Sequence, residues 1–347
     1  MSLPGYSQYK DSGVPWLGKV PKHWPVHETK RHFLRKKVIN TGMACENRLA
    51  LTMNGVVPRS LDDLDGLQSS DYEGYQLFEK GDLAFKLIDL QNIKTSRVGL
   101  VPERGIMSPA YIRLQPLGNT DSRFAYWYFM ALYWNQVFNS LGGGVRQTLG
   151  PEELLTLEYP APPLDEQTVI AAFLDRETAK IDALIAEQEK LLTLLAEKRR
   201  ATISHAVTKG MNPDAPMKDS GVAWLGEVPA HWSVKQLRHI ARIVRGASPR
   251  PAGDPAYFSG EPEGNTPWVT VAEVTKDTSQ YLSEVSEYLT PAGVECSQFF
   301  ERGTLVFTNS GATLGVPKIL AINCCANDGI LAFKNLSHEV SISFVYN

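Results

Sequence analysis

The chain has 347 residues, of which 43% are hydrophobic and 21% charged, and its formal net charge is −3. These values are typical of a soluble globular protein, and the length predicts two globular units. The four cysteines are too few for a disulfide scaffold, and the first residues do not resemble an export signal. Because no apolar run reaches the roughly 18 residues of a membrane helix, we expect a cytoplasmic protein without a membrane partner.

Basic residues are concentrated in two stretches of this mildly acidic chain. Residues 20–60 hold eight Lys and Arg against two acids, and residues 235–250 hold five Lys and Arg with no acid. The net charge argues mildly against a nucleic-acid binder, since such domains usually carry a basic footprint. The distribution matters more than the sum, and the two stretches favour local anionic partners.

The chain contains a duplicated segment. Residues 10–26 (KDSGVPWLGKVPKHWPV) return as residues 218–234 (KDSGVAWLGEVPAHWSV), with 13 of 17 positions identical at a constant offset of 208. A weaker repeat relates residues 79–85 (EKGDLAF) to residues 301–307 (ERGTLVF), and an alternating apolar strand follows each copy. A period this long indicates a duplicated domain and not a solenoid.

An aromatic-rich helix is predicted within residues 123–140 of the first copy, followed by a glycine run at residues 142–144. We interpret its aromatic side chains as core and helix-packing surface. The glycine run permits a close backbone approach to phosphate or a simple turn of the chain, and the sequence leaves both open.

A long helix is predicted over residues 165–208, which lack Pro and Gly and are rich in Ala, Leu, Glu and Lys. Asp165 is its expected N-cap, and Gly210 and Pro213 end it. About 44 residues at 1.5 Å each give a rod of roughly 65 Å. Seven-residue spacing predicts an apolar seam of coiled-coil type. The seam is formed by Leu174, Ile181, Leu184, Leu191 and Leu195.

These elements predict an α+β protein with tandem mixed α/β domains joined by a coiled-coil-type helix. The expected boundaries are 1–160 for the first domain, 161–210 for the spacer helix and 211–347 for the second domain. Counted from Lys218, the second copy reaches only the equivalent of residues 125–128. We therefore expect the second domain to be incomplete.

Several motifs together resemble the specificity subunits of type I restriction-modification systems. They are the repeated opening segment, residues 142–149 (GGGVRQTL), residues 160–168 (PAPPLDEQT) and the helix end at residues 198–207 (KRRATISHAV). The resemblance covers essentially the whole chain, but residues 40–140 and 247–347 are not distinctive.

This resemblance implies two target-recognition domains, each of which reads one half of a split site in double-stranded DNA. It also implies that long helices set the distance between the domains and dock methyltransferase (modification) subunits, with a restriction and translocation subunit outside them. The absent second helix departs from the family pattern.

The sequence favours a non-catalytic subunit without a cofactor or metal. Residues 13–19 fit the start of a phosphate-binding loop (GxxxxGK), but Val20 follows where Ser or Thr is needed. His23 has no Cys or His partner at metal-ligand spacing and is expected to hydrogen-bond within its own module.

DNA contact would draw affinity from Lys and Arg at phosphates, and specificity from side chains that reach base edges. The candidates in the first domain are Lys86, Lys94, Arg97, Arg146 and Gln147, and those in the second are Asn309 and Lys318.

Three alternatives remain open at this stage. One is a coiled-coil adaptor that binds protein instead of DNA, and another is an inactive remnant. The third is self-pairing of two copies through residues 165–208, which would create a palindromic reader.

Overall fold

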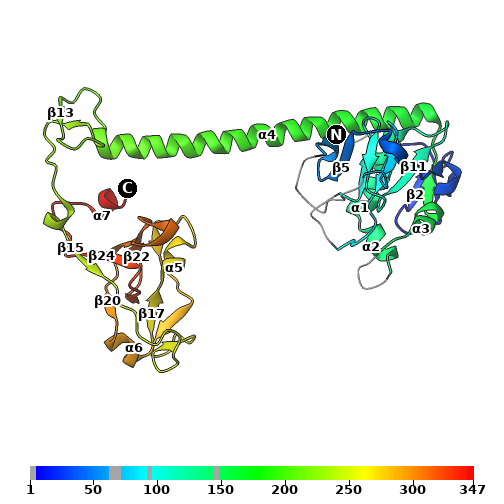
Figure 1. The fold of residues 1–347 in the computed structure, drawn as a ribbon. Helices are drawn as coiled ribbons and strands as arrows, with labels where there is room; N and C mark the ends of the chain where they lie inside the picture. Colours follow the sequence, from blue (N-terminus) through cyan, green and yellow to red (C-terminus); the bar gives the residue numbers. More distant parts are fainter. Residues whose placement is uncertain (1–4, 62–71, 92–95, 144–147) are drawn as a thin grey trace. The chain divides into compact units, whose positions relative to one another are not determined.

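The structure is a computed structural model that describes residues 5–61, 72–91, 96–143 and 148–347. The chain divides into two compact units, which we call the first unit (Met1–Gln188) and the second unit (Glu189–Asn347). Each is built on β-sheets, and one long helix, α4 (Leu164–Lys209), continues from one into the other (Figure 1). The predicted α+β class with a long central helix is confirmed.

The first unit contains two four-stranded sheets, with strand orders β6-β5-β10-β7 and β4-β11-β8-β9. The pairing of β10 with β5 is parallel, and the other pairings in these sheets are antiparallel. The strands are β4 (Phe33–Arg35), β5 (Arg48–Thr52), β6 (Gly55–Arg59), β7 (Gln76–Phe78), β8 (Leu83–Phe85), β9 (Val98–Leu100), β10 (Gly105–Met107) and β11 (Ile112–Pro116).

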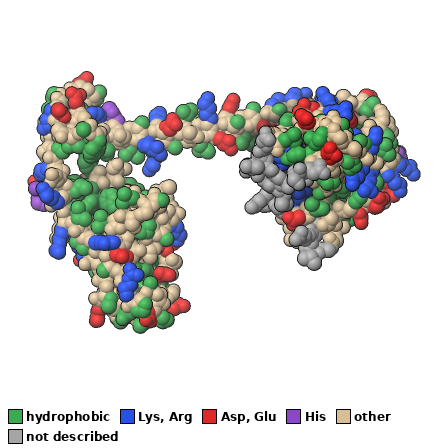
Figure 2. All heavy atoms as spheres, in the orientation of Figure 1, with side chains coloured by type: hydrophobic (Ala, Val, Ile, Leu, Met, Phe, Trp, Pro, Cys, Tyr) green, Lys and Arg blue, Asp and Glu red, His purple; other side chains and the backbone are tan. Residues whose placement is uncertain are grey.

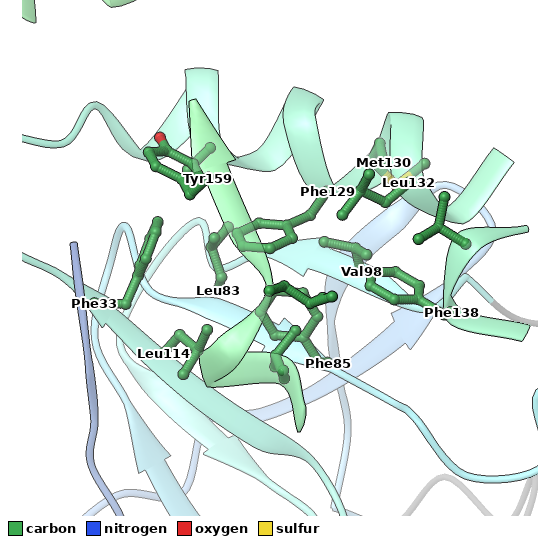
Figure 3. Close-up of a cluster of buried hydrophobic side chains, with 14 of the residues drawn as sticks. Phe33, Leu83, Phe85, Val98, Leu114, Phe129, Met130, Leu132, Phe138 and Tyr159 are labelled. Carbon is green, nitrogen blue, oxygen red and sulfur yellow. The ribbon is translucent and has the colours of Figure 1, made fainter. Parts of the chain in front are cut away.

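Helix α1 (Ser122–Trp134) closes the main core of the first unit. The Asp121 side chain caps it by accepting hydrogen bonds from two backbone N–H groups in the first turn. Figure 3 shows Phe129 directed from α1 toward Leu83 and Phe85 on the sheet, and the Phe129 and Phe85 rings meet edge to face at 5.0 Å. The interpretation of the aromatic helix as core is confirmed, because Phe129 is fully buried. Two short helices follow, α2 (Val137–Leu141) and α3 (Pro151–Thr156).

The second unit contains two five-stranded sheets, with orders β15-β24-β21-β22-β18 and β16-β19-β17-β23-β20. The first sheet is formed by β15 (Arg242–Arg245), β18 (Tyr281–Leu282), β21 (Leu305–Thr308), β22 (Pro317–Leu320) and β24 (Ile330–Lys334). The second sheet is formed by β16 (Phe258–Ser259), β17 (Thr266–Val269), β19 (Glu287–Leu289), β20 (Gln298–Phe300) and β23 (Cys324–Ala326). Its short helices are α5 (Val271–Thr275), α6 (Pro291–Glu295) and α7 (Ile342–Tyr346).

The two units share one strand plan. The order β15-β24-β21-β22 repeats β4-β11-β8-β9, and the parallel pair β17·β23 repeats the parallel pair β5·β10. In each unit one further antiparallel strand, β7 or β20, lies beside that pair. The duplication read from the sequence is therefore a duplication of fold.

The repeated opening segment forms the same hairpin twice. Strand β1 (Tyr9–Asp11) pairs with β2 (Lys19–Pro21), and β13 (Met217–Asp219) pairs with β14 (Glu227–Pro229) in identical register. In the first copy the Asp11 carboxylate accepts a hydrogen bond from the N–H of Gly13 at 2.9 Å, and Gly13 has φ of 74°. This positive φ explains the glycine, and the segment forms a structural turn instead of a phosphate-binding loop.

The start of α4 is fixed to the first unit by buried polar contacts. The Gln167 side chain accepts a hydrogen bond from the N–H of Asp121 at 2.9 Å and donates one to the carbonyl of Pro162 at 2.8 Å. About two turns further along α4, Asp175 accepts hydrogen bonds from Arg123 and from the Trp127 indole. Since Asp121 and Trp127 begin and line α1, these bonds set the direction in which α4 leaves the domain.

The first unit also contains a buried ion pair, between Arg113 on β11 and Asp82 at 2.6 Å, with both side chains at most 3% exposed. Burial raises the pKa of Asp82, although the Glu79 N–H and Arg113 stabilise its charged form. In the repeat, Thr304 and Ala332 take these two positions. Loss of both charges together fits the rule that a buried pair contributes little net stability, whereas a single buried charge is costly.

We predict that Asp82→Ala lowers the free energy of unfolding by about 3–5 kcal/mol, because Arg113 would keep a buried charge without its carboxylate. The double variant Asp82→Thr/Arg113→Ala, which copies the repeat, should lose much less. Urea denaturation measures both values. Glu79→Ala is the control, since its 3.6 Å ion pair with Arg104 is exposed and contributes at most about 1 kcal/mol. Equal losses in the single and double variants would contradict this account.

Candidate nucleic-acid interface

Strand register brings several loops of the first unit to one end of its sheet. Arg35 at the end of β4 lies opposite Leu114 near the start of β11, and Ile112 lies opposite Phe85 at the end of β8. The segments that follow β4 and β8 and precede β11 therefore lie together. We call residues 36–38, 86–91 and 108–111 the first loop edge.

The first loop edge is basic and contains a groove of about 250 Å³. Lys36 and Lys37 line the groove and are exposed, and neither has an ion-pair partner among the described residues. Arg35 is exposed as well, but it pairs with Glu152 at 3.1 Å. Two exposed lysines without an acid partner suit the phosphate backbone of a nucleic acid.

The residues predicted to contact DNA in the first domain lie in different environments. Lys86 lies half-buried at the first loop edge, where burial lowers its pKa. Arg97 is only 1% exposed and donates hydrogen bonds to the carbonyls of Ile88 and Asp89. Arg97 is therefore an interior residue that holds its own loop, and we no longer assign it a DNA contact.

Lys94, Arg146 and Gln147 lie outside the described residues. The residues beside the last two are placed at the groove, because the N–H of Leu149 donates to the carbonyl of Leu87 at 2.9 Å and Thr148 lines the groove.

The same register forms a corresponding edge in the second unit. Arg245 lies opposite Leu331, and Thr308 lies opposite Ile330. We call residues 246–250, 309–316 and 327–329 the second loop edge. Its segments approach each other closely, since the N–H of Ala247 donates to the carbonyl of Ala326 at 2.9 Å.

Of the predicted contacts in the second unit, one is interior and one supports a neighbouring loop. Lys318 is 2% exposed, and its ammonium group bonds the Asp277 carboxylate at 2.5 Å, which lowers the pKa of Asp277. We therefore remove Lys318 from the candidate contacts. Asn309 is half-buried, and its amide donates to the carbonyl of Asp328 at 3.2 Å.

A polar cluster surrounds Asp328, and no motif in the sequence predicts it. The Ser248 hydroxyl donates to the Asp328 carboxylate at 2.8 Å, and Arg250 lies 3.7 Å from its other oxygen. Arg245 donates through Nε to the main-chain carbonyl of Asp328 at 2.6 Å. The Ser248 hydrogen bond is the largest cause of the lowered pKa of Asp328, and the two arginines add to it. Both arginines belong to the basic stretch 235–250, which was the only signal in the sequence.

His23 departs from its expected role within its own module. Its Nε2 atom lies 3.0 Å from the Glu166 carboxylate in the first turn of α4, and the Tyr6 hydroxyl donates to the same carboxylate. The opening segment thus contacts the spacer helix.

The apolar seam of α4 is covered at its start and exposed along its middle. Leu174 is half-buried, whereas Ile181, Leu184, Leu191 and Leu195 have between 46% and 57% of their surface exposed. Hydrophobic side chains are visible at the surface along α4 in Figure 2. Such a row of exposed Leu and Ile marks an interaction surface.

The repeated opening segment is covered differently in the two units. In the first, β3 (Val26–Glu28) pairs with β12 (Glu158–Pro160), and Trp16 is partly buried. In the second, Trp224 at the matching position is 84% exposed, and Trp232 contacts the Phe344 ring at 5.9 Å beside a groove of about 1140 Å³. The second unit therefore presents an additional apolar surface.

Residues 54–193 match the family described as the type I restriction modification DNA specificity domain. The chain is also 23% identical over 252 residues to the putative type I restriction enzyme MjaX specificity subunit of Methanocaldococcus jannaschii, a match that covers 67% of this chain. The chain is therefore similar to type I specificity subunits, with the family match confined to residues 54–193. These relatives are named as specificity subunits, which agrees with the expectation of a non-catalytic subunit.

A second relative in that organism, the type I restriction enzyme MjaIX specificity subunit, is 28% identical over 114 residues, or 32% of this chain. The matched regions span 56% of the MjaX and 24% of the MjaIX subunit, so the chain spans about half the length of its curated relatives or less.

Two solved structures resemble this fold. The HsdS subunit from Thermoanaerobacter tengcongensis gives a TM-score of 0.55 at 13% identity. A structure described in terms of complex assembly and conformational transition of the type I R-M system gives 0.60 at 15% identity. Each match covers 94% of this chain and 80% of the other. At these identities the similarity concerns the fold alone.

In the described part of the chain, no helix combines the length and apolar character needed to cross a bilayer. The same residues include no cluster of three or more His, Cys, Asp or Glu side chains arranged to hold a metal ion.

We predict that Gly246→Ala destabilises the second unit by about 1–3 kcal/mol, because two backbone atoms would clash with the new methyl group. A Cβ at Gly246 would lie 2.1 Å from the carbonyl oxygen of Asn327 and 2.4 Å from that of Ala326. Thermal unfolding measures the loss. Gly260→Ala is the matched control, since a Cβ there has no neighbour within 4 Å. Equal stability of the two variants would refute the close approach of these loops.

Proposed function

We propose that this chain is the DNA sequence-specificity subunit of a type I restriction-modification complex and that it reads a two-part DNA site. The observation that carries the proposal is the repetition of one strand plan, with a loop edge bearing exposed basic side chains in each copy. A family defined by DNA specificity domains supports the reading of sequence.

Affinity and specificity come from different parts of the loop edges. Lys36 and Lys37 at the first loop edge, and Arg245 at the end of β15 beside the second loop edge, supply charge for phosphates. Lys86, Lys94, Arg146 and Gln147 remain proposed contacts of the first unit. Asn309 acts in the second unit by holding the loop that carries Asp328.

Helix α4 sets the spacing between the two readers. We keep residues 1–160, 161–210 and 211–347 as the proposed recognition, spacer and recognition segments. A helix of 46 residues is roughly 69 Å long, and the bonds of Gln167 and Asp175 fix its start. Because tethering raises effective concentration, two modest half-site affinities combine only at DNA sites of matching spacing.

The exposed seam of α4 is the proposed docking surface for methyltransferase subunits, with a restriction and translocation subunit joining outside them. The same surface also favours pairing of two copies, since a Leu-rich row is self-complementary. The solution mass of the isolated chain distinguishes these assemblies, and a strict monomer excludes self-pairing.

We predict that Lys36→Glu/Lys37→Glu weakens binding to duplex DNA about equally for all sequences and lowers the slope of log affinity against log salt by about 2. Electrophoretic mobility shifts at several salt concentrations measure both. Lys80→Glu/Arg104→Glu is the matched control, because it makes the same change in charge at the other end of the sheet. Lys80 precedes β8 and Arg104 follows β9, and both are exposed and lie away from the first loop edge. Salt-independent binding, or no binding by the native chain, would favour the protein-binding adaptor.

We predict that a seven-residue helical insertion after Lys190 changes the preferred spacer of the DNA site without changing either half-site. Seven residues add about 10.5 Å to the helix, which equals the length of roughly 3 base pairs of DNA. They make two full turns to within about 20°, so the second unit keeps nearly the same orientation about the helix axis. Selection from randomised duplexes, compared with the native chain, measures the spacer. An unchanged spacer would show that α4 does not set the distance between the two half-sites.

A further inference from the structure

Arg250 is held at the second loop edge by its neighbours in the chain. It lies between Pro249, which is buried, and Pro251. Proline fixes its own φ and restricts the residue before it, so the backbone at Arg250 has little freedom. The Ser297 hydroxyl also anchors this loop by donating to the carbonyl of Ala247 at 2.6 Å.

The carboxylate that faces Arg250 is fixed as well. Ser248 both donates to the Asp328 carboxylate and accepts from the Asp328 N–H, at 2.8 Å and 3.3 Å. The Asp328 carbonyl accepts from Arg245 and from Asn309. The loop edge therefore holds one carboxylate oxygen ready beside the Arg250 guanidinium.

Asp328 orients the guanidinium of Arg250 but does not use its hydrogen-bond donors. A separation of 3.7 Å is an ion pair and too long for a hydrogen bond, and the Arg250 side chain is 70% exposed. Among the described residues this ion pair is the only polar partner recorded for it. Its N–H donors remain available to a ligand.

The ligand that fits this arrangement is a neutral acceptor pair and not an anion. A carboxylate beside the guanidinium repels a phosphate, whereas Lys36 and Lys37 at the first loop edge have no such acid. Two parallel N–H donors of arginine match O6 and N7 of guanine in the major groove. A fixed supporting residue is what such a contact needs, since an unsupported arginine loses rotamer entropy on binding.

We propose that Arg250 reads a guanine in the half-site of the second unit and that Asp328 is its positioning residue. This inference rests on the proposed function of the chain. Arg250 supplies the two donors to the base edge, and Asp328 orients the guanidinium and keeps it away from the DNA backbone.

The test begins with selection of randomised duplexes by the full native chain and by Arg250→Lys. Lysine keeps the charge but lacks the paired donors, so the preference for guanine at one position of the half-site should fall roughly 10- to 100-fold while overall affinity stays similar. Arg302→Lys is the matched control, since Arg302 is exposed at the other end of β21 and should leave the motif unchanged.

Two further measurements separate base reading from phosphate binding. Replacement of that guanine by 7-deazaguanine, which lacks the N7 acceptor, should weaken the native chain and leave Arg250→Lys unaffected. Asp328→Asn should lower the guanine preference yet raise affinity for non-specific DNA, because a negative charge is removed from the edge. A merely structural role of Asp328 would lower both. Circular dichroism confirms that each variant is folded.

The possible failures are distinct. If the native chain enriches a motif and Arg250→Lys enriches the same motif with the same guanine preference, the assignment of Arg250 is overturned and Arg250 is a phosphate contact. If the native chain binds no DNA and enriches no motif, the proposed function itself fails.

Discussion

The candidate interface depends on strand register. In the first unit Phe85 at the end of β8 lies opposite Ile112 at the start of β11. In the second unit Thr308 at the end of β21 lies opposite Ile330 at the start of β24. Loops that are far apart in the sequence must then lie at one end of the sheet. A one-residue slip would turn the buried face of each strand outward, so the cores formed around Phe129 and around Ile330 hold the register. Because the cores hold the strand register, the loops at this end differ in sequence between the two units while the strand order stays the same.

The two units reach the same plan with different interiors. The first buries the Arg113–Asp82 ion pair, and the second has Ala332 and Thr304 at those positions. The second unit instead buries Lys318, whose ammonium group pairs with the exposed Asp277 carboxylate on a neighbouring segment. A duplicated domain tolerates such exchanges when the members of a buried pair change together, since the unpaired intermediate is the costly state. The apolar faces of the strands therefore maintain the common strand order, and each ion pair stabilises only the unit that contains it.

Patterns that are local in sequence predicted the fold well, and contacts between distant residues could not be predicted. The seven-residue spacing gave a helix over 165–208, and the structure has it from Leu164 to Lys209. Arg97 was predicted as a surface contact, yet it is buried, because Lys and Arg spacing does not reveal whether the side chain meets backbone carbonyls inside. The Arg250–Asp328 pair joins residues 78 positions apart, and only the pairing of strands brings them together.

Helix α4 combines an exposed apolar seam with a start that is attached firmly to the first unit. A lone helix gains little from its apolar residues until a partner covers them, so its direction must be fixed by other contacts. Gln167 and Asp175 provide these through hydrogen bonds to the first residues of α1. The residues that would meet a partner, such as Leu184 and Leu191, are then left half-exposed instead of folding back on their own domain. A helix that is anchored by polar bonds and apolar along its free length holds its direction before assembly and gains stability when a partner binds.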